Sequence, residues 1–223
     1  MIIEKHNLKT GFPIGRAVTI LRKEVPRYTV PIVSHYEASP FKVLISTLLS
    51  LRTKDKTTAV AAQRLFAEAD TPEAILRLPL ETLEKLVYPV GFYKNKAKTL
   101  HHVCKTLLEH YGGKVPASLD ELLTIKGIGR KTANLVVTLG FNLPGICVDV
   151  HVHRISNRWG YVKTAAPDET EAALRKKLPK KYWIEFNDLL VTYGQNVCLP
   201  VSPHCSKCPL ADFCPRIGVT RHR

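Results

Sequence analysis

Apolar residues recur every three or four positions along most of this chain, which is the spacing of amphipathic helices. The segment 41–51 is apolar on nearly every side, so we expect it to form a central helix. The segment 93–111 carries one apolar stripe and ends at Gly112 and Gly113, which predicts a long helix that stops there. No sustained alternation of polar and apolar residues marks a strand. The pattern predicts an all-α protein with two helical lobes.

Several of the expected helices begin at a residue that can cap exposed backbone N–H groups. Ser39 stands before Pro40, Asp55 stands before the segment 56–69, and Ser118 forms a capping box with Glu121. The segment 56–69 should turn an apolar stripe inward, made of Ala59, Ala62, Leu65 and Phe66. The expected helices are 40–51, 56–69, 71–77, 80–87, 93–111, 118–124, 130–139, 150–159, 167–178 and 181–197.

The charge of the chain is strongly positive. It has 33 Lys and Arg residues against 19 Asp and Glu residues, which is a formal net charge of +14 at pH 7. Such an excess favours a polyanionic partner, most simply a nucleic acid. A generally basic protein with no such partner would have the same composition, so charge alone leaves both interpretations open.

The sequence also bears on location. No stretch approaches the roughly eighteen apolar residues of a membrane span, and the first residues lack the apolar core of a secretory signal. Six cysteines, four of them clustered, suit a reducing cytoplasm with a metal centre better than a secreted disulfide scaffold. The other two, Cys104 and Cys147, lie in apolar segments and should be buried.

The clustered cysteines are Cys198, Cys205, Cys208 and Cys214, separated by six, two and five residues. Four thiolates in one short loop can surround a single inorganic centre. Zinc often uses paired Cys-x-x-Cys units, and this array contains one such unit. The spacing by itself is therefore compatible with zinc and with an iron–sulfur cluster.

A second motif lies upstream, where Gly127 and Gly129 flank Ile128 just before an expected helix. Glycines permit a tight turn and a close approach of backbone, and the N–H groups of the new helix can bind a phosphate. Lys126 and Arg130 add positive charge on either side. Many helix pairs turn at glycine without binding anything, but the basic flanks and the net charge favour contact with DNA or RNA.

Lys131 lies in the first turn of that helix. The positive end of the helix dipole and the neighbouring cations favour its neutral amine, which can attack a sugar carbon and form a Schiff base. On these residues alone, a solvated lysine that binds phosphate is the simpler interpretation.

Asp149 follows eighteen residues after Lys131, within an apolar run. A carboxylate among apolar residues is costly unless it has a partner or a role, and capping the next helix is one such role. His151 and His153 follow it two residues apart, so they do not share a helix face and are a poor pair of metal ligands. We expect His151 at the edge of a pocket and His153 in a structural role.

The segments Leu123–Asn134 and Leu143–His151 resemble the helix-hairpin-helix and Gly/Pro-Asp signature of the endonuclease III family of DNA glycosylases. The spacing of the four cysteines is similar to the [4Fe-4S] loop of the same family. Gly91–Ala97 and Leu48–Ser50 also resemble its motifs, and the likeness extends from about residue 34 to residue 214.

This resemblance implies a specific reaction. A damaged pyrimidine is flipped out of the duplex into a pocket between the lobes. Lys131 attacks C1′ of its sugar and displaces the base, and Asp149 activates the lysine or stabilises positive charge on the sugar. The Schiff base then permits β-elimination, which cuts the strand on the 3′ side. Family members that lack an amine at this position have no efficient lyase activity, and this chain retains the amine.

The resemblance also implies partners, a cofactor and two domains. The partner is double-stranded DNA with a damaged base or an abasic site, contacted by the hairpin residues and by His151. The four cysteines hold a [4Fe-4S] cluster that keeps the loop in shape. A six-helix domain would cover residues 33–143, and residues 1–32 with 144–223 would form the second. The protein is expected to be a cytoplasmic monomer, associated with the nucleoid in a bacterium or archaeon.

The chain departs from the family pattern at the DNA-facing positions. Arg52 stands where the family often has a glutamine that fills the space of the flipped nucleotide, and a surface arginine is the alternative. Phe92 matches an apolar wedge against the opposite strand, with a core aromatic as the alternative. Between the first two cysteines, where basic residues are usual, the segment 199–204 has no Lys or Arg. Lys207 and Arg216 are candidates to replace them.

Two other functions compete with the bifunctional enzyme. A monofunctional mismatch or adenine glycosylase on the same fold is disfavoured by Lys131, and by the few residues that follow the cysteine array. A non-catalytic DNA-binding protein whose cluster senses the redox state would retain the cysteine array and the hairpin without using the lysine.

Overall fold

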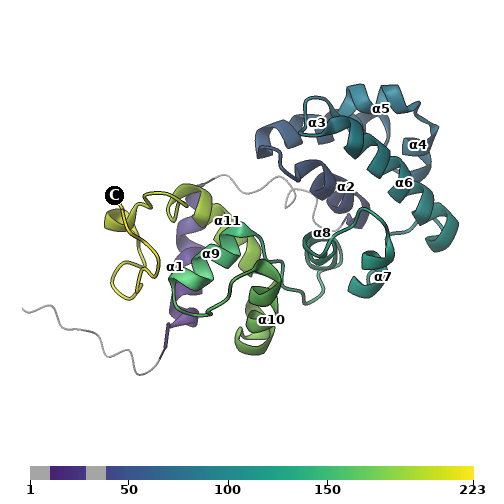
Figure 1. The fold of residues 1–223 in the computed structure, drawn as a ribbon. Helices are drawn as coiled ribbons and strands as arrows, with labels where there is room; N and C mark the ends of the chain where they lie inside the picture. Colours follow the sequence, from purple (N-terminus) through teal and green to yellow (C-terminus); the bar gives the residue numbers. More distant parts are fainter. Residues whose placement is uncertain (1–10, 29–38) are drawn as a thin grey trace, which may run out of the picture. The chain divides into compact units, whose positions relative to one another are not determined.

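The computed structural model describes residues 11–28 and 39–223, and this part of the chain is helical with no strand. The all-α prediction is therefore confirmed (Figure 1). The α-helices are α1 (Ile14–Glu24), α2 (Pro40–Ser50), α3 (Asp55–Glu68), α4 (Pro72–Arg77), α5 (Leu80–Val87), α6 (Tyr93–Tyr111), α7 (Leu119–Thr124), α8 (Arg130–Leu135), α9 (Val150–Arg158), α10 (Pro167–Lys177) and α11 (Trp183–Asn196).

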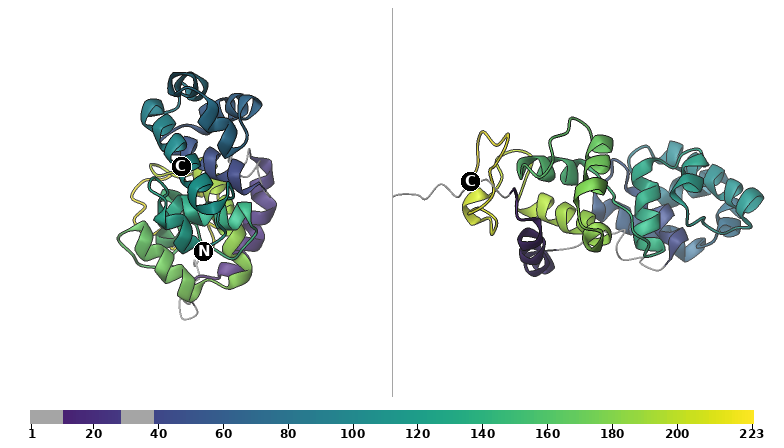
Figure 2. Two further views of the ribbon diagram at one scale, coloured as in Figure 1. Left: turned by 90° about the vertical axis from the view of Figure 1, so that its right-hand side faces the viewer. Right: turned by 90° about the horizontal axis from the view of Figure 1, so that it is seen from below.

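The described residues form two compact units, one of residues 39–145 and one of residues 11–28 with 146–223. A boundary at residues 32 and 33, as expected from the sequence, lies outside the described residues. The first unit contains α2 to α8, and the second contains α1 and α9 to α11 (Figure 1). Within the second unit, α1 packs on α11 although the two helices lie far apart in the sequence (Figure 2).

The sequence pattern did not predict α1. Its buried face is short, made of Ala17, Val18 and Leu21, and Pro13 at its N-cap offers no side-chain cap. Arg22 fastens its outer side to Glu185 of α11 through two hydrogen bonds of 2.8 and 2.6 Å. The tertiary packing on α11 therefore stabilises a helix whose own start signal is weak.

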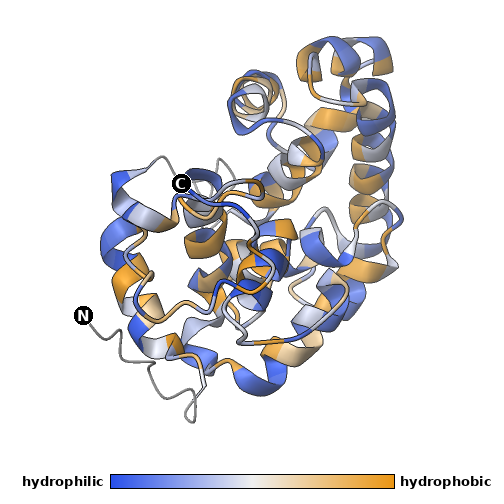
Figure 3. Ribbon diagram, turned by 60° about the vertical axis from the view of Figure 1, so that its left-hand side comes forward, coloured by the Kyte–Doolittle hydropathy of each residue, from blue (hydrophilic) through white to orange (hydrophobic). Residues whose placement is uncertain are grey.

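In the unit of residues 39–145, α2 is the central helix, as its apolar sequence predicts. Seven consecutive residues, 43–49, are buried. The surrounding helices bury one face each, and Figure 3 shows apolar and polar positions alternating along them. Cys104 lies fully buried on α6, as predicted, and Cys147 is buried in the other unit.

Two predicted details of α3 were wrong. Asp55 is the first residue of the helix and not its cap, because Lys54 has the extended backbone of the N-cap. The inward face consists of Thr58, Ala61, Ala62 and Leu65, so the predicted stripe is rotated. The Thr58 hydroxyl can be buried there because it donates a 3.3 Å hydrogen bond to the Lys54 carbonyl.

The helix expected over 130–139 is regular only as far as Leu135, where a π-helical turn takes over for Val136–Gly140. The Thr138 hydroxyl donates to the Asn134 carbonyl at 2.8 Å, and such back-bonding accompanies local widening of a helix. A side chain on Gly140 would come within 2.8 Å of Pro40, so this turn packs closely on the start of α2.

The core of the unit of residues 11–28 and 146–223 is rich in aromatic side chains. Trp159, Phe186 and Tyr193 are almost fully buried, and Phe12 stacks on Trp159 with ring centroids 4.7 Å apart. These contacts hold α9 and α11 together under the loop that carries the clustered cysteines. Among the described residues, no helix combines the length and apolar composition that a membrane span requires.

Candidate functional site

Two buried apolar side chains anchor the hairpin between α7 and α8 to the protein core. Ile125 and Ile128 are buried, and the Ile128 N–H donates to the Ile125 carbonyl at 3.0 Å to close the turn. Gly127 has φ = +101°, and a side chain there would come within 2.7 Å of Thr99 on α6. The fold itself therefore requires a glycine at position 127.

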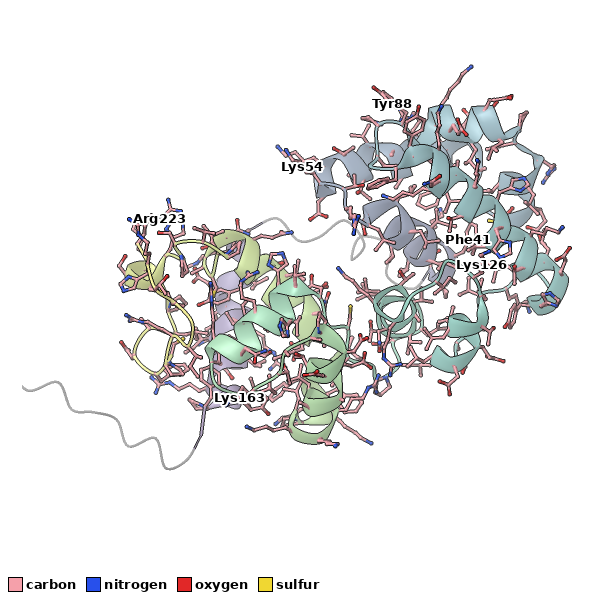
Figure 4. All side chains as sticks on the ribbon, in the orientation of Figure 1. Phe41, Lys54, Tyr88, Lys126, Lys163 and Arg223 are labelled. Carbon is pink, nitrogen blue, oxygen red and sulfur yellow. The ribbon has the colours of Figure 1, made fainter. Side chains whose placement is uncertain are left out.

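Gly129 is different, because its φ of −91° is ordinary and an added Cβ would meet no atom within 4 Å. Nothing in the described residues requires a glycine there, and a bare backbone facing outward is suited to a close approach by a ligand. Lys126, Arg130 and Lys131 are all exposed around this backbone. Figure 4 shows Lys126 on the turn between α7 and α8. The hairpin thus presents three cations and an open helix start on one exposed surface.

Asp149 combines burial with a capping role, as the sequence predicts. Its side chain is 8 % exposed, and its Oδ1 accepts the backbone N–H groups of His151 at 2.9 Å and Val152 at 3.0 Å. The preceding residues 146–148 are buried, and Asn187 donates to the Cys147 carbonyl at 3.2 Å. These contacts fix the position of the carboxylate at the start of α9.

The two histidines of α9 point to different neighbours. His153 contacts the Thr170 hydroxyl at 2.7 Å, which agrees with its predicted structural role. His151 contacts Arg154 at 3.1 Å, and its ring lies so close to Gly194 that a Cβ there would come within 2.5 Å. The structure thus places the imidazole of His151 against α11, where it helps to pack the helix that Asp149 begins.

Arg52 and Phe92 lie on two adjacent loops and share an uncommon backbone conformation. Both have positive φ, 53° at Arg52 and 58° at Phe92. Phe92 is 62 % exposed, so the alternative of a core aromatic is wrong. The Arg52 guanidinium lies 5.9 Å from the centre of the Phe92 ring, and both side chains project from the surface as a pair.

A buried lysine that the sequence did not single out holds these two loops together. Lys96 on α6 donates from Nζ to the carbonyls of Leu49 at 2.7 Å and Leu51 at 2.6 Å. It also donates to the Thr53 hydroxyl at 2.9 Å, and Thr53 in turn accepts the Gly91 N–H at 3.0 Å. The segment with Arg52 and the segment with Phe92 are therefore joined through Lys96 and Thr53.

This lysine lies in an environment that opposes its charge and also binds it. Burial lowers the pKa of the Lys96 ammonium to about 8. Its three oxygen acceptors favour the charged form, and two of them are carbonyls at the end of α2, where a cation also complements the helix dipole.

The close approach of the two loops also requires a glycine at position 91. A Cβ there would come within 2.7 Å of the Arg52 carbonyl.

We expect Lys96→Met to lower the free energy of unfolding by about 1–3 kcal/mol, because the buried Leu49 carbonyl and the partly buried Leu51 carbonyl lose their donor while the side chain keeps a similar length. Urea unfolding followed by circular dichroism measures the change. Lys98→Met is the matched control, because Lys98 is exposed on the same helix and should change stability by less than about 0.5 kcal/mol. Equal stability of the two variants would show that the Lys96 contacts do not hold the loops.

The four clustered cysteines line one cavity in the C-terminal loop. Donors surround the sulfur atoms: the Tyr193 hydroxyl lies 2.7 Å from Cys208, the Leu210 N–H 3.4 Å from Cys208, and the Arg158 guanidinium 3.4 Å from Cys198. Such donors stabilise negative charge on sulfur. Burial acts in the opposite direction and raises the pKa of the Cys208 thiol, and that of the Cys214 thiol to about 11. A cationic centre that replaces the thiol protons would leave negative charge on the sulfur atoms, where the donors stabilise it. The centre would also balance that charge inside the buried loop.

The two kinds of centre need different spacings of their thiolates. In residues 11–28 and 39–223, no three His, Cys, Asp or Glu side chains converge as the ligands of one metal ion would. A tetrahedral zinc site holds its thiolates ~3.8 Å apart, given Zn–S bonds of about 2.3 Å. A four-iron cluster places an iron behind each thiolate and needs four thiols around a larger space. All four cysteines line one cavity, which meets the need of a cluster for four thiols around a single space.

Two arginines of α9 support this loop, and the sequence pattern did not reveal them. Arg158 donates to the carbonyls of Leu199 at 2.6 Å and Pro200 at 2.7 Å, and Arg154 donates to the Cys198 carbonyl at 2.8 Å. They are four residues apart on one helix face, which was a usable signal. The helix that begins at Asp149 thus also anchors the first cysteine.

Two family descriptions match the chain. Residues 45–180 match the HhH-GPD superfamily base excision DNA repair protein. Residues 198–214 match the iron-sulfur binding domain of endonuclease III, and this match begins at Cys198 and ends at Cys214. The first region contains both Lys131 and Asp149.

The chain is also similar to characterised proteins. It is 46% identical to "Endonuclease III" of Thermotoga maritima over 81% of this chain and 85% of that protein. It is 46% identical to "Endonuclease III homolog 2, chloroplastic" of Arabidopsis thaliana over 78% of this chain, and it spans about half (48%) of that longer protein. A solved "non-covalent Endonuclease III-DNA Complex" is 34% identical with a TM-score of 0.82, covering 91% of this chain and 94% of the other.

Proposed function

Because this chain belongs to the endonuclease III family of DNA glycosylases, we infer that its exposed hairpin and its buried carboxylate serve one reaction on DNA. The protein is a base-excision-repair DNA glycosylase with lyase activity at abasic sites. The observation that carries our residue assignment is the exposed Lys131 in the first turn of α8, beside an open backbone with two further cations.

We propose Lys131 as the nucleophile. Its neutral amine attacks C1′ of the damaged nucleotide, and the bond between C1′ and the base breaks, with its electron pair leaving on the base. Loss of the amine protons and opening of the sugar ring give a Schiff base between Nζ and C1′. Removal of a proton from C2′ then expels the 3′ phosphate, which cuts the strand. Release of the enzyme by water restores the free amine.

We propose Asp149 as the carboxylate that assists this attack. A charge held at a fixed position by two backbone N–H groups stabilises positive charge that develops on the sugar. The same carboxylate, if it accepts a proton from Lys131, produces the neutral amine that attacks. Both actions require Lys131 and Asp149 to meet at one nucleotide, and this remains a prediction.

We propose that the remaining DNA contacts come from two surfaces of the unit of residues 39–145. The hairpin, with Lys126, Gly127, Gly129 and Arg130, binds phosphates without reading bases. The Arg52 and Phe92 pair occupies the space of a flipped nucleotide and supports the opposite strand. The partner of the protein is duplex DNA with a damaged pyrimidine or an abasic site. We propose that a monomer binds this DNA in the cytoplasm. His151 follows closely after Asp149. We propose that it supports the DNA-binding site through its backbone N–H, which donates to Asp149, and through its contact with Arg154.

The protein carries a [4Fe-4S] cluster. We propose Cys198, Cys205, Cys208 and Cys214 as its ligands, supported by the sulfur-directed donors of Tyr193, Leu210 and Arg158. When bound, the cluster supplies a rigid cross-link of the loop, and the reaction at the sugar needs no electron transfer from it. Arg154 and Arg158 hold this loop against α9.

Borohydride trapping on a duplex with one abasic site tests the assignment. Reduction of a Schiff base leaves a stable covalent adduct, which we expect as a shifted band on a denaturing gel. Binding without an adduct would favour the non-catalytic DNA-binding alternative. Base release without strand cleavage would favour a monofunctional glycosylase. A panel of damaged pyrimidines against each opposing base then defines the substrate.

A further inference from the structure

Two loops of the first unit meet at Thr53 and Lys96, which we call the loop clamp. The Thr53 hydroxyl accepts the Gly91 N–H at 3.0 Å and the Lys96 ammonium at 2.9 Å, so it bridges the segment after α2 and the segment before α6. Lys96 joins the same segments through its two ends. Its backbone N–H donates to the Phe92 carbonyl at 3.0 Å, and its Nζ donates to the Leu51 carbonyl at 2.6 Å. The two loops are thus connected by a network of hydrogen bonds.

Each loop is also fastened at its own base. The Thr53 N–H donates to the Ser50 carbonyl at 3.0 Å, which turns the chain at the end of α2. Arg64 of α3 donates to the Leu86 carbonyl at 2.7 Å and to the Tyr88 carbonyl, where the second loop begins. These contacts fix each loop to the helices around it, and the loop clamp fixes the loops to each other.

The loops present Arg52 and Phe92 in a backbone conformation that the local chain does not favour. The φ angle is 53° at Arg52 and 58° at Phe92, and neither residue is glycine. Such left-handed backbone persists where the surrounding contacts hold it. The loop clamp contacts both sites, because Thr53 follows Arg52 and because Lys96 accepts its bond at the Phe92 carbonyl. The direction in which the two exposed side chains leave the surface therefore depends on the clamp.

We propose that Thr53 and Lys96 are positioning residues that hold Arg52 and Phe92 in one fixed arrangement for insertion into the duplex. The inference rests on the proposed function, in which Arg52 and Phe92 occupy the space of the flipped nucleotide and support the opposite strand. Lys96 is only 9 % exposed and Thr53 is half-buried, so the clamp acts through the pair. Two side chains that are held in place before binding lose less entropy when they insert.

Thr53→Val tests the proposal, because valine keeps the branched shape and removes the hydroxyl that both loops share. We expect the Kd for a duplex with a tetrahydrofuran abasic analogue, measured by fluorescence anisotropy, to rise by about tenfold. A 2-aminopurine opposite the analogue should brighten when the unaltered protein inserts and unstacks it. This increase in fluorescence should be largely lost in Thr53→Val.

Three further variants make the result specific. Thr53→Ser keeps the hydroxyl and should stay within about twofold of the unaltered protein in Kd. Gly91→Ala should act like Thr53→Val, because its Cβ would come within 2.7 Å of the Arg52 carbonyl and must push the loops apart. Thr106→Val is the matched control, since the hydroxyl of this half-buried threonine donates to the His102 carbonyl within α6 at 3.1 Å, and it should change neither signal. Thermal unfolding of each variant sets an assay temperature well below its midpoint.

A double-mutant cycle separates positioning from a general loss of structure. Arg52→Ala with Phe92→Ala removes the inserted pair and should also raise the Kd by about tenfold. If the clamp acts through this pair, adding Thr53→Val should raise the Kd by less than about a further twofold. Two independent losses would multiply to about a hundredfold.

The outcomes distinguish the clamp from the proposed function. Unchanged signals in Thr53→Val and Gly91→Ala, or an equal loss in Thr106→Val, overturn the positioning role while the insertion of Arg52 and Phe92 stands. A multiplicative loss in the cycle overturns it as well. If the variant without both inserted side chains binds and brightens the duplex like the unaltered protein, the insertion is wrong and the positioning role falls with it, whereas the Lys131 chemistry is tested separately by trapping.

Discussion

Lys131→Gln should eliminate the borohydride-trapped adduct entirely, because an amide nitrogen cannot form a Schiff base. Glutamine keeps a similar length and the ability to donate a hydrogen bond, so the hairpin should still bind DNA. Strand cleavage at a preformed abasic site should fall by at least about a thousandfold, to the level of uncatalysed elimination. Trapping measures the first effect, and single-turnover cleavage measures the second.

The matched control is Lys126→Gln, which removes an exposed lysine from the same hairpin. It should weaken binding through one phosphate contact and reduce the salt slope by about 0.9, while the adduct still forms at saturating enzyme. An adduct that persists in Lys131→Gln and vanishes in Lys126→Gln would assign the nucleophile to the other side of the turn.

Local signals predicted the helices well where the cap residue acts through its own side chain. Ser118 accepts the Glu121 N–H at 3.4 Å and Thr71 accepts the Ala74 N–H at 3.2 Å, so the starts of α7 and α4 follow from the sequence. The helix α6 ends at Gly112 with φ = +58°, which is the glycine stop that the pattern predicts. These features depend on residues within one turn of each other.

The features that sequence analysis missed depend on distant contacts. Lys96 lies on the apolar face of α6, and only the carbonyls at the end of α2 explain why a lysine is stable there. The π-helical turn at Val136–Gly140 likewise meets α2. Such requirements arise from packing between elements, and no local spacing encodes them.

The residues of the candidate site also fall into those set by short local motifs and those set by distant contacts. The cysteine array, the hairpin and Asp149 were predicted because each is a short motif with its own chemistry. The position of Arg223 was not, because its backbone and its side chain meet the cysteine loop only through hydrogen bonds between distant segments. The resemblance implied DNA-facing roles for Arg52 and Phe92, with a surface arginine and a core aromatic as the alternatives. The structure adds their shared positive φ and their common support by Thr53 and Lys96.

Asp149→Asn should slow base release by roughly two to four orders of magnitude while leaving the fold and DNA binding nearly unchanged. Asparagine caps a helix about as well as aspartate, so Oδ1 can still accept the N–H groups of His151 and Val152. The substitution therefore removes the charge and the proton acceptor but keeps the cap. Single-turnover release of a damaged pyrimidine from a duplex measures the rate, and thermal unfolding monitors stability.

Asp149→Ala distinguishes the two roles of this residue, because it removes the cap as well as the charge. It should match the asparagine variant in rate and lose a further roughly 1 kcal/mol of stability, from the exposed start of α9. A slow rate in the alanine variant with a normal rate in the asparagine variant would mean that the cap alone matters to catalysis. An unimpaired rate in both would remove Asp149 from the reaction, since a carboxylate that stabilises charge on the sugar cannot be dispensable.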